Sequence, residues 1–185
     1  MHAIFARLPA KLQPEAQATL ASLNLDPAQQ RARLDALAAE LPPGDVRRGQ
    51  LVFNNAKSTC TACHSLGYLG GKFGPDLTSI GQVRNERDLL EAVVFPSASF
   101  VRSYEPMVVK MKSGTEMTGI VHGESAETLT LGIGPGVDQR LSRAEIAEMQ
   151  PGSYSLMPQG FDQILTRQEL SDLIVFLKAS VRKPN

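Results

Sequence analysis

Hydrophobic residues follow two spacings along the chain, and the first is helical. Residues 8 to 41 are rich in Ala, Leu and Gln, and prolines at positions 9, 14 and 27 divide them into short helical pieces. Asp26 and Pro27 are typical of a helix N-cap and first helical position, and Leu34, Leu37, Ala38 and Leu41 keep one apolar face. Because Pro-Pro-Gly follows at 42–44, residues 1–43 are expected to form a helical appendage or the end of a preceding domain.

Three further helices are predicted after this boundary. Asp45 is a suitable N-cap for a helix that reaches about residue 55 and contains Gly49. A mid-helix glycine costs ~1 kcal/mol relative to alanine, which indicates that another backbone comes close there. A second helix is expected over 85–95, before Pro96. The third begins at the capping-box sequence 166–169 and carries an apolar stripe.

Between residues 104 and 150 the spacing changes to two, the period of a β-strand. Apolar residues alternate with other residues over 107–111, 117–121 and 129–133, which predicts a three-stranded meander. Residues 137–141 are a candidate fourth strand and 146–150 a candidate fifth. The sequence 142–145 is also typical of a capping box, so a short helix is the alternative there. The block resembles a small Sm-like or SH3-like β module.

The stretch Cys60-Thr61-Ala62-Cys63-His64 carries the strongest chemical signal. Two thiols three residues apart and an adjacent imidazole suit covalent haem: the cysteines form thioethers to the vinyl groups, and His64 ligates the iron. A thioredoxin-like dithiol would require a surrounding βαβ pattern, which the sequence lacks. A zinc site would require four ligands, but these are the only two cysteines, and His2 and His122 lie far off. One covalent haem c per chain is therefore expected.

Composition limits the remaining possibilities. Lys plus Arg and Asp plus Glu both number 19, so net charge does not indicate nucleic acid or an anionic membrane as a partner. Aromatic residues make up only 5% of the chain, and a flat apolar cofactor would complete the core. No apolar run approaches the ~20 residues that span a bilayer, and the first ten residues lack a signal-peptide pattern.

The order of motifs resembles that of class I c-type cytochromes. Cys60 to His64 is followed by Gly74-Pro75-Asp76-Leu77 and then by Ser155-Leu156-Met157-Pro158 before the last helix. Residues 74–81, with 89–92 and 96–97, are more closely similar to the haem-binding domain near the C-terminal end of large predicted membrane-associated dehydrogenase-like proteins. The resemblance covers about 44–182. It implies a mainly α class I cytochrome c fold with a small antiparallel β module inserted at about 104–150.

The resemblance also assigns roles to residues. Pro75 matches the position whose carbonyl accepts a hydrogen bond from the proximal histidine's Nδ1, although a proline in a turn is the alternative. The C-terminal helix is the implied partner of Gly49. Met157, in an irregular loop stiffened by Pro158, is the implied second axial ligand, so His64 and Met157 would be the metal ligands.

The other methionines and histidines are weaker candidates for the second iron ligand than Met157. Met107, Met111 and Met117 are expected in the core of the sheet, Met149 is ambiguous, and Met1 lies in a terminal segment. His122 would give bis-histidine ligation, but an outward-facing strand position favours a solvated histidine. His2 is a weaker candidate still.

The expected function is one-electron transfer with no catalytic residue. The resemblance implies a dehydrogenase domain as electron donor, on the same or a partner polypeptide, and a cytochrome or terminal oxidase as acceptor. Haem is attached to this motif chiefly outside the bacterial cytoplasm, so a periplasmic or otherwise extracytoplasmic piece of a longer exported protein is expected. Two alternatives stay open: a small-ligand sensor or peroxidase-like enzyme with a labile Met157, and an interaction module with a structural haem.

Overall fold

The computed structural model describes residues 27–181 and divides the chain into two compact units, 1–37 and 38–185. Helix α3 (Pro27–Glu40) begins where the proline predicted, and Leu34 and Leu37 on its apolar face are buried. The helical pieces expected between residues 8 and 26 lie outside the described residues. Among residues 27–181, no helix is both long and apolar enough to cross a membrane.

Local capping explains where the longer helices of the second unit begin. The side chain of Asp45 accepts a hydrogen bond from the backbone N–H of Arg48, and Thr166 and Glu169 form both bonds of a capping box. These caps were predicted and are confirmed. The helices are α4 (Val46–Phe53), α5 (Cys60–Cys63), α6 (Ile80–Val83), α7 (Glu86–Val94), α8 (Phe161–Ile164) and α9 (Arg167–Ala179).

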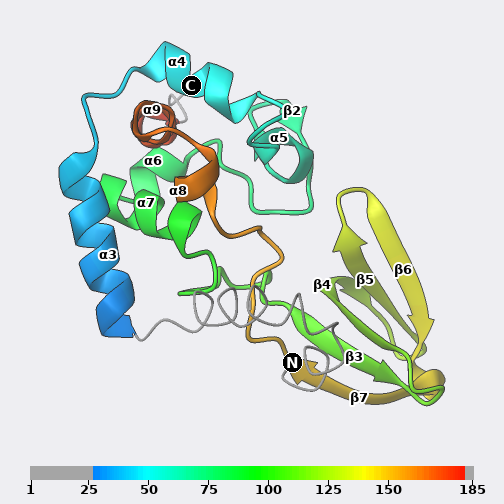
Figure 1. The fold of residues 1–185 in the computed structure, drawn as a ribbon. Coiled ribbons are helices and arrows are strands. Elements are labelled where there is room, and N and C mark those ends of the chain that lie inside the picture. The colour runs from blue at the N-terminus through cyan, green and yellow to red at the C-terminus, as the bar shows by residue number, and fades with distance from the viewer. Residues whose placement is uncertain (1–26, 182–185) are drawn as a thin grey trace. The chain divides into compact units, whose positions relative to one another are not determined.

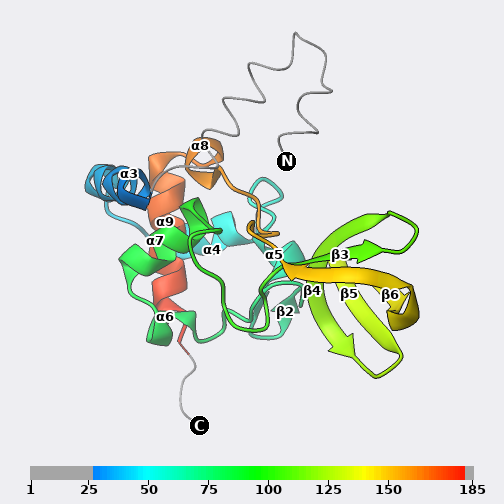
Figure 2. The same ribbon diagram turned by 90° about the horizontal axis from the view of Figure 1, so that it is seen from below.

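Helix α4 crosses α9 with the two backbones in close approach (Figure 1; Figure 2). A Cβ atom added to Gly49 would lie 2.5 Å from the Cβ of Phe176 and would overlap the carbonyl oxygen of Asp172. Phe53 and Phe176 also pack together, with ring centroids 5.6 Å apart. The prediction that the C-terminal helix approaches Gly49 is therefore confirmed.

A buried carboxylate joins the two helices at this crossing. Asp172 is only 2% exposed and accepts hydrogen bonds from Arg48 Nε at 2.7 Å and from a second guanidinium nitrogen at 2.9 Å. It also accepts bonds from the Asp45 backbone N–H at 2.7 Å and the Gln168 side chain at 2.9 Å. The hydrogen bond from Arg48 is the main reason that the pKa of Asp172 lies below its ordinary value. The carboxylate thus stays charged and fully paired.

The block from residue 107 to 151 forms an antiparallel sheet with the strand order β6-β5-β4-β3-β7 (Figure 1). Its strands are β3 (Met107–Met111), β4 (Glu116–Glu124), β5 (Thr128–Gly134), β6 (Val137–Ser142) and β7 (Ile146–Pro151). All five strands were expected, and β7 returns to pair with β3. The alternative for 142–150 is present as well, because a short 3-10 helix over Arg143–Glu145 precedes β7.

One face of this sheet has its own apolar core. Its centre is the buried cluster Val109, Met111, Leu129, Leu131 and Leu141. Met107, Met117 and Met149 pack against the same cluster as partly buried side chains. The methionine stripe is therefore core packing, as predicted for Met107, Met111 and Met117.

The predicted fold class is wrong. Of the described residues, 38% are helical and 24% lie in strands, so this is a mixed fold of helices and an antiparallel sheet, not a mainly α class I cytochrome c fold with a small insert. The physical reason is that the last strand, β7, pairs with the first, β3, and that the five-stranded sheet buries a separate core. It is thus a substantial part of the fold with its own core rather than a minor insertion into a helical domain.

Candidate haem-binding site

The two cysteines lie on one short helical turn, α5, which follows Thr59 in a left-handed conformation with φ 52°. Residues three apart in a helix lie on one face, so the turn presents both sulfurs to the same side. Cys60 and Cys63 are free thiols, half-buried, and both line one cavity. Burial raises the pKa of each thiol.

His64 directly follows this turn, and Pro75 holds its ring. Nδ1 of His64 lies 2.8 Å from the backbone carbonyl oxygen of Pro75. Since a carbonyl can only accept, Nδ1–H donates and the neutral ring keeps a lone pair on Nε2. Burial lowers the pKa of His64, and the bond to Pro75 opposes that effect. The expected hydrogen bond is present, while the role of these residues at a haem stays a prediction.

The glycine-rich segment after His64 folds back over α5. The N–H of Gly71 donates to the carbonyl of Thr61 at 2.8 Å, and the N–H of Gly74 donates to that of Cys63 at 2.7 Å. An added Cβ at Gly74 would lie 2.6 Å from Cε1 of His64, so a larger residue would displace the ring. The segment also contains the short antiparallel pair β1 (Ser65–Leu66) and β2 (Leu69–Gly70).

Met157 comes to the same cavity from near the C-terminal helix. It is half-buried in the irregular segment between β7 and α8. Its N–H donates to Ser155 Oγ at 3.1 Å, and the N–H of Ser155 donates to Ser97 Oγ at 3.0 Å. The bond to Ser97 joins the segment to the chain just after α7, and the bond to Ser155 stabilises the turn that holds Met157. The structure thus brings all five predicted site residues around one cavity: Cys60, Cys63, His64, Pro75 and Met157.

The wall of the cavity is largely apolar. The cavity has a volume of about 250 Å³ and is partly open to solvent. Arg84 is the cation in the wall. The apolar lining comes from the region around α7 and from the C-terminal helices, with Leu89, Val93, Pro96, Phe100, Phe161 and Leu177.

Two residues of the wall were missed by the sequence reasoning. Tyr104, just before β3, and Ile120, in β4, also line the cavity, so the sheet block contributes to the cavity wall. Ile120 shares the strand face opposite the sheet core with Thr118 and His122, yet it is only 6% exposed. An apolar residue on that otherwise polar face was the signal that could have revealed the contact.

These features fit a covalently attached haem. Two reduced thiols lie on one helical face beside an oriented imidazole with an available Nε2, and a thioether is in reach of the same cavity. Arg84 offers a partner for a propionate carboxylate.

The competing donors lie elsewhere or outside the described residues. His122 pairs with Asp138 at 2.8 Å and is not in the cavity wall. Met149 packs on the sheet core, and Met1 and His2 fall outside the described residues. Within residues 27–181, no group of three or more His, Cys, Asp or Glu side chains is placed to hold a metal ion.

Comparison with models of protein families finds no match to the chain, and comparison with curated proteins finds none either. The resemblance to c-type cytochromes therefore rests on the motifs quoted above and on the geometry of the cavity.

Proposed function

We propose that this chain is a mono-haem c-type cytochrome that carries out one-electron transfer. The observation that carries the proposal is the cavity in which Cys60, Cys63 and His64 meet Met157, a residue far away in the sequence. Chance would rarely bring two adjacent thiols, an oriented imidazole and a thioether to one apolar cavity.

Each residue has a defined task in this proposal. Cys60 and Cys63 would anchor the haem through thioethers, and His64 and Met157 would be the ligands of its iron. Pro75 orients the imidazole and increases its basicity through the hydrogen bond to Nδ1. The apolar wall excludes water, and the bound haem supplies the reversible one-electron change of its iron. No residue needs to act as an acid, base or nucleophile.

The setting follows from the motif and from the resemblance. A dehydrogenase domain is the proposed electron donor, and a cytochrome or terminal oxidase is the proposed acceptor. The proposed location is periplasmic or otherwise extracytoplasmic, because thioether attachment to this motif occurs chiefly there in bacteria.

The test is attachment of the pigment after export of the chain in a host that matures c-type cytochromes. We expect acid-acetone to leave the colour in the protein, an intact mass increased by one haem, and a pyridine haemochrome spectrum of the c type. The double variant Cys60→Ala/Cys63→Ala should lose all covalent haem, whereas the control Met149→Leu should keep it. Pigment that extracts into solvent, or zinc in place of haem, would overturn the proposal.

A further inference from the structure

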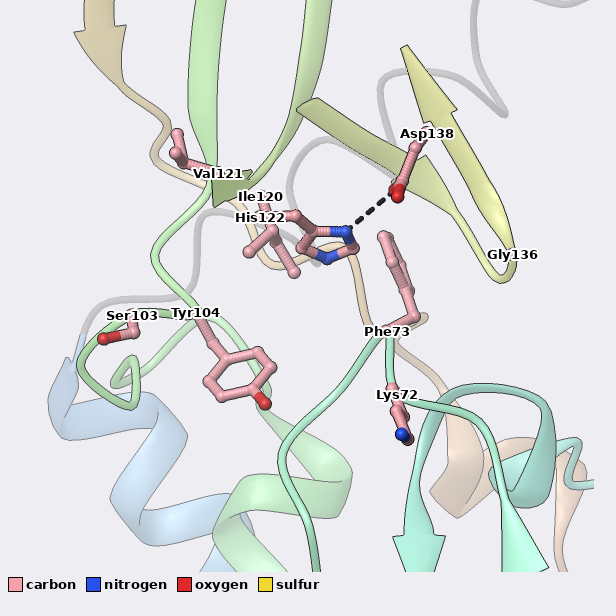
Figure 3. A pocket seen from close by; sticks show the side chains of 9 residues that line it. All are labelled: Lys72, Phe73, Ser103, Tyr104, Ile120, Val121, His122, Gly136 and Asp138. Carbon is pink, nitrogen blue, oxygen red and sulfur yellow. Dashed lines mark hydrogen bonds and ion pairs between the residues drawn. The ribbon is translucent and has the colours of Figure 1, made fainter. Parts of the chain in front are cut away.

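A second pocket lies beside the sheet, with a volume of about 450 Å³ (Figure 3). This is within the ~300–1,000 Å³ of small-molecule sites. Its walls come from the loop after β2, the segment before β3, and strands β4 and β6 with the turn before β6. Phe73, Tyr104 and Ile120 line both this pocket and the candidate haem cavity, so the two share a wall.

His122 is the polar group of this pocket with a defined hydrogen-bonding state. Its Nδ1 lies 2.8 Å from Oδ1 of Asp138. A carboxylate accepts, so Nδ1 carries the hydrogen and Nε2 of the neutral ring is an acceptor. The pair is the only hydrogen bond or ion pair among the nine side chains drawn in Figure 3. The pocket therefore offers an acceptor at Nε2 to a ligand.

Packing holds the imidazole in place. A Cβ atom added to Gly132 would lie 2.7 Å from Nε2 of His122, so the ring lies directly over this glycine. Phe73 meets the ring edge-on, with centroids 6.2 Å apart and an interplanar angle of 76°. A ring fixed on three sides loses little conformational entropy when it binds a ligand.

The remaining wall suits a planar, uncharged molecule. Figure 3 shows the rings of Phe73 and Tyr104 projecting beside His122, and Ile120 and Val121 add aliphatic surface. Lys72 and Asp138 contribute one charge of each sign, and Asp138 is already engaged by His122. The pocket thus has no excess charge with which to select an ion.

We propose that this pocket binds a small neutral aromatic molecule with a hydroxyl group, a compound of the phenol class. Its ring packs on Phe73 and Tyr104, and its O–H donates to Nε2 of His122. The inference does not require haem, although a molecule bound here lies against the wall of the haem cavity.

Calorimetric titration of the full chain with three probes tests the proposal. Phenol should bind saturably at one site. Anisole, in which a methyl group replaces the hydroxyl hydrogen, should bind about threefold to tenfold more weakly, the contribution of one hydrogen bond. Benzoate, which is close to anisole in size but charged, should bind more weakly than phenol.

Two variants isolate the hydrogen bond. His122→Phe keeps a ring but lacks the acceptor, so phenol and anisole should then bind equally. Asp138→Asn can donate to Nδ1 and move the ring hydrogen to Nε2, which should abolish the preference for phenol because the oxygens of both probes can accept from Nε2–H. Glu148→Gln on β7, outside the pocket, is the control and should change nothing. If His122→Phe loses the sheet's circular dichroism, Asp138→Asn decides the outcome.

Several outcomes would overturn the inference. These are unsaturable phenol binding, equal affinity for phenol and anisole in the unmodified chain, or tighter binding of benzoate that depends on Lys72. Haem content is measured in the same samples. Phenol binding without haem would overturn only the proposed function, and haem without phenol binding would overturn only this inference.

Discussion

The helices α4 to α9 and the five-stranded sheet are stabilised in different ways. The sheet closes around a contiguous apolar cluster centred on Val109, Leu129 and Leu131. The helices bury apolar side chains as well, but they also surround a cavity and are joined by polar contacts between distant segments, such as Arg48 with Asp172. Another such contact is Lys178, whose ammonium donates to the carbonyls of Gly81 and Arg84. From this difference we expect the stability of the helices to depend more on what fills the cavity than that of the sheet does.

The largest expected effect separates the two regions by removal of haem. In the Cys60→Ala/Cys63→Ala variant, amide hydrogen exchange in α4, α7 and α9 should accelerate by about 100-fold or more, or ~2.7 kcal/mol, because the proposed haem would no longer pack against the cavity wall and bind His64 and Met157. Exchange in β3 and β5 should change by less than about threefold. Equal acceleration in the sheet would show that its stability also depends on haem, through Ile120.

The next effect compares a glycine from each region. Gly49→Ala forces a methyl group against the backbone of α9 and should destabilise the protein by about 1–3 kcal/mol in urea unfolding, despite the better helix propensity of alanine. Gly123→Ala on β4 is the control, since an added Cβ there meets nothing within 4 Å, and it should stay within about 0.5 kcal/mol. A neutral Gly49→Ala would contradict the close approach of the two helices.

Acid should weaken the helix crossing through Asp172. Its pKa in the folded protein is below the ordinary 3.8, so its contribution is complete above about pH 3.8 and is lost as the pH falls through the lower folded value. Asp172→Asn should therefore destabilise the protein at pH 7 by about 1–3 kcal/mol, and the gap from the parent should shrink toward pH 2.

The exposed pair Arg143–Glu124 of the sheet region is the matched control for this acid effect. Glu124→Gln should change the free energy of unfolding at pH 7 by less than about 1 kcal/mol, because water screens the pair. A gap for Asp172→Asn that stays constant with pH would rule out the assigned role of the charge.

The smallest expected effect in free energy concerns Met157. Met157→Ala should retain covalent haem but lower the midpoint potential by ~60 mV, about 1.4 kcal/mol for one electron, because a thioether favours ferrous iron. The weak far-red band of the ferric protein should disappear, and the ferrous protein should bind carbon monoxide. Met149→Ala is the control.

If the band and the potential persist in Met157→Ala but are lost in Met149→Ala or in His122→Ala, Met157 is not the ligand. Ready binding of carbon monoxide by the unmodified protein would instead favour the sensor alternative.

Local features of the site and the fold were predictable. The caps at Asp45, Asn85 and Thr166 and the five strands depend on neighbouring residues, which favour one backbone conformation through short hydrogen bonds and side-chain alternation. The bond between His64 and Pro75 joins residues only 11 apart, with glycines that let the intervening loop turn back.

Contacts between distant segments were decided only by the tertiary structure. The sequence indicates Met157 as a ligand by resemblance, but its place beside Cys60 depends on the hydrogen bonds that lead from Ser97 to its loop. The pairing of Arg48 with Asp172 and of His122 with Asp138 leaves no periodic trace, because each side chain alone resembles a solvated surface group.

The proportion of helix and sheet shows most clearly what could not be predicted from the sequence alone. Alternation identified each strand, since the period of two is a property of the backbone itself. Two long-range contacts decided whether the strands formed a small insert or a sheet with its own core. These are the pairing of β7 with β3 and the position of Ile120 in the wall of the cavity. Such long-range contacts are selected by the burial of apolar area over the whole chain, which no local stretch of sequence encodes.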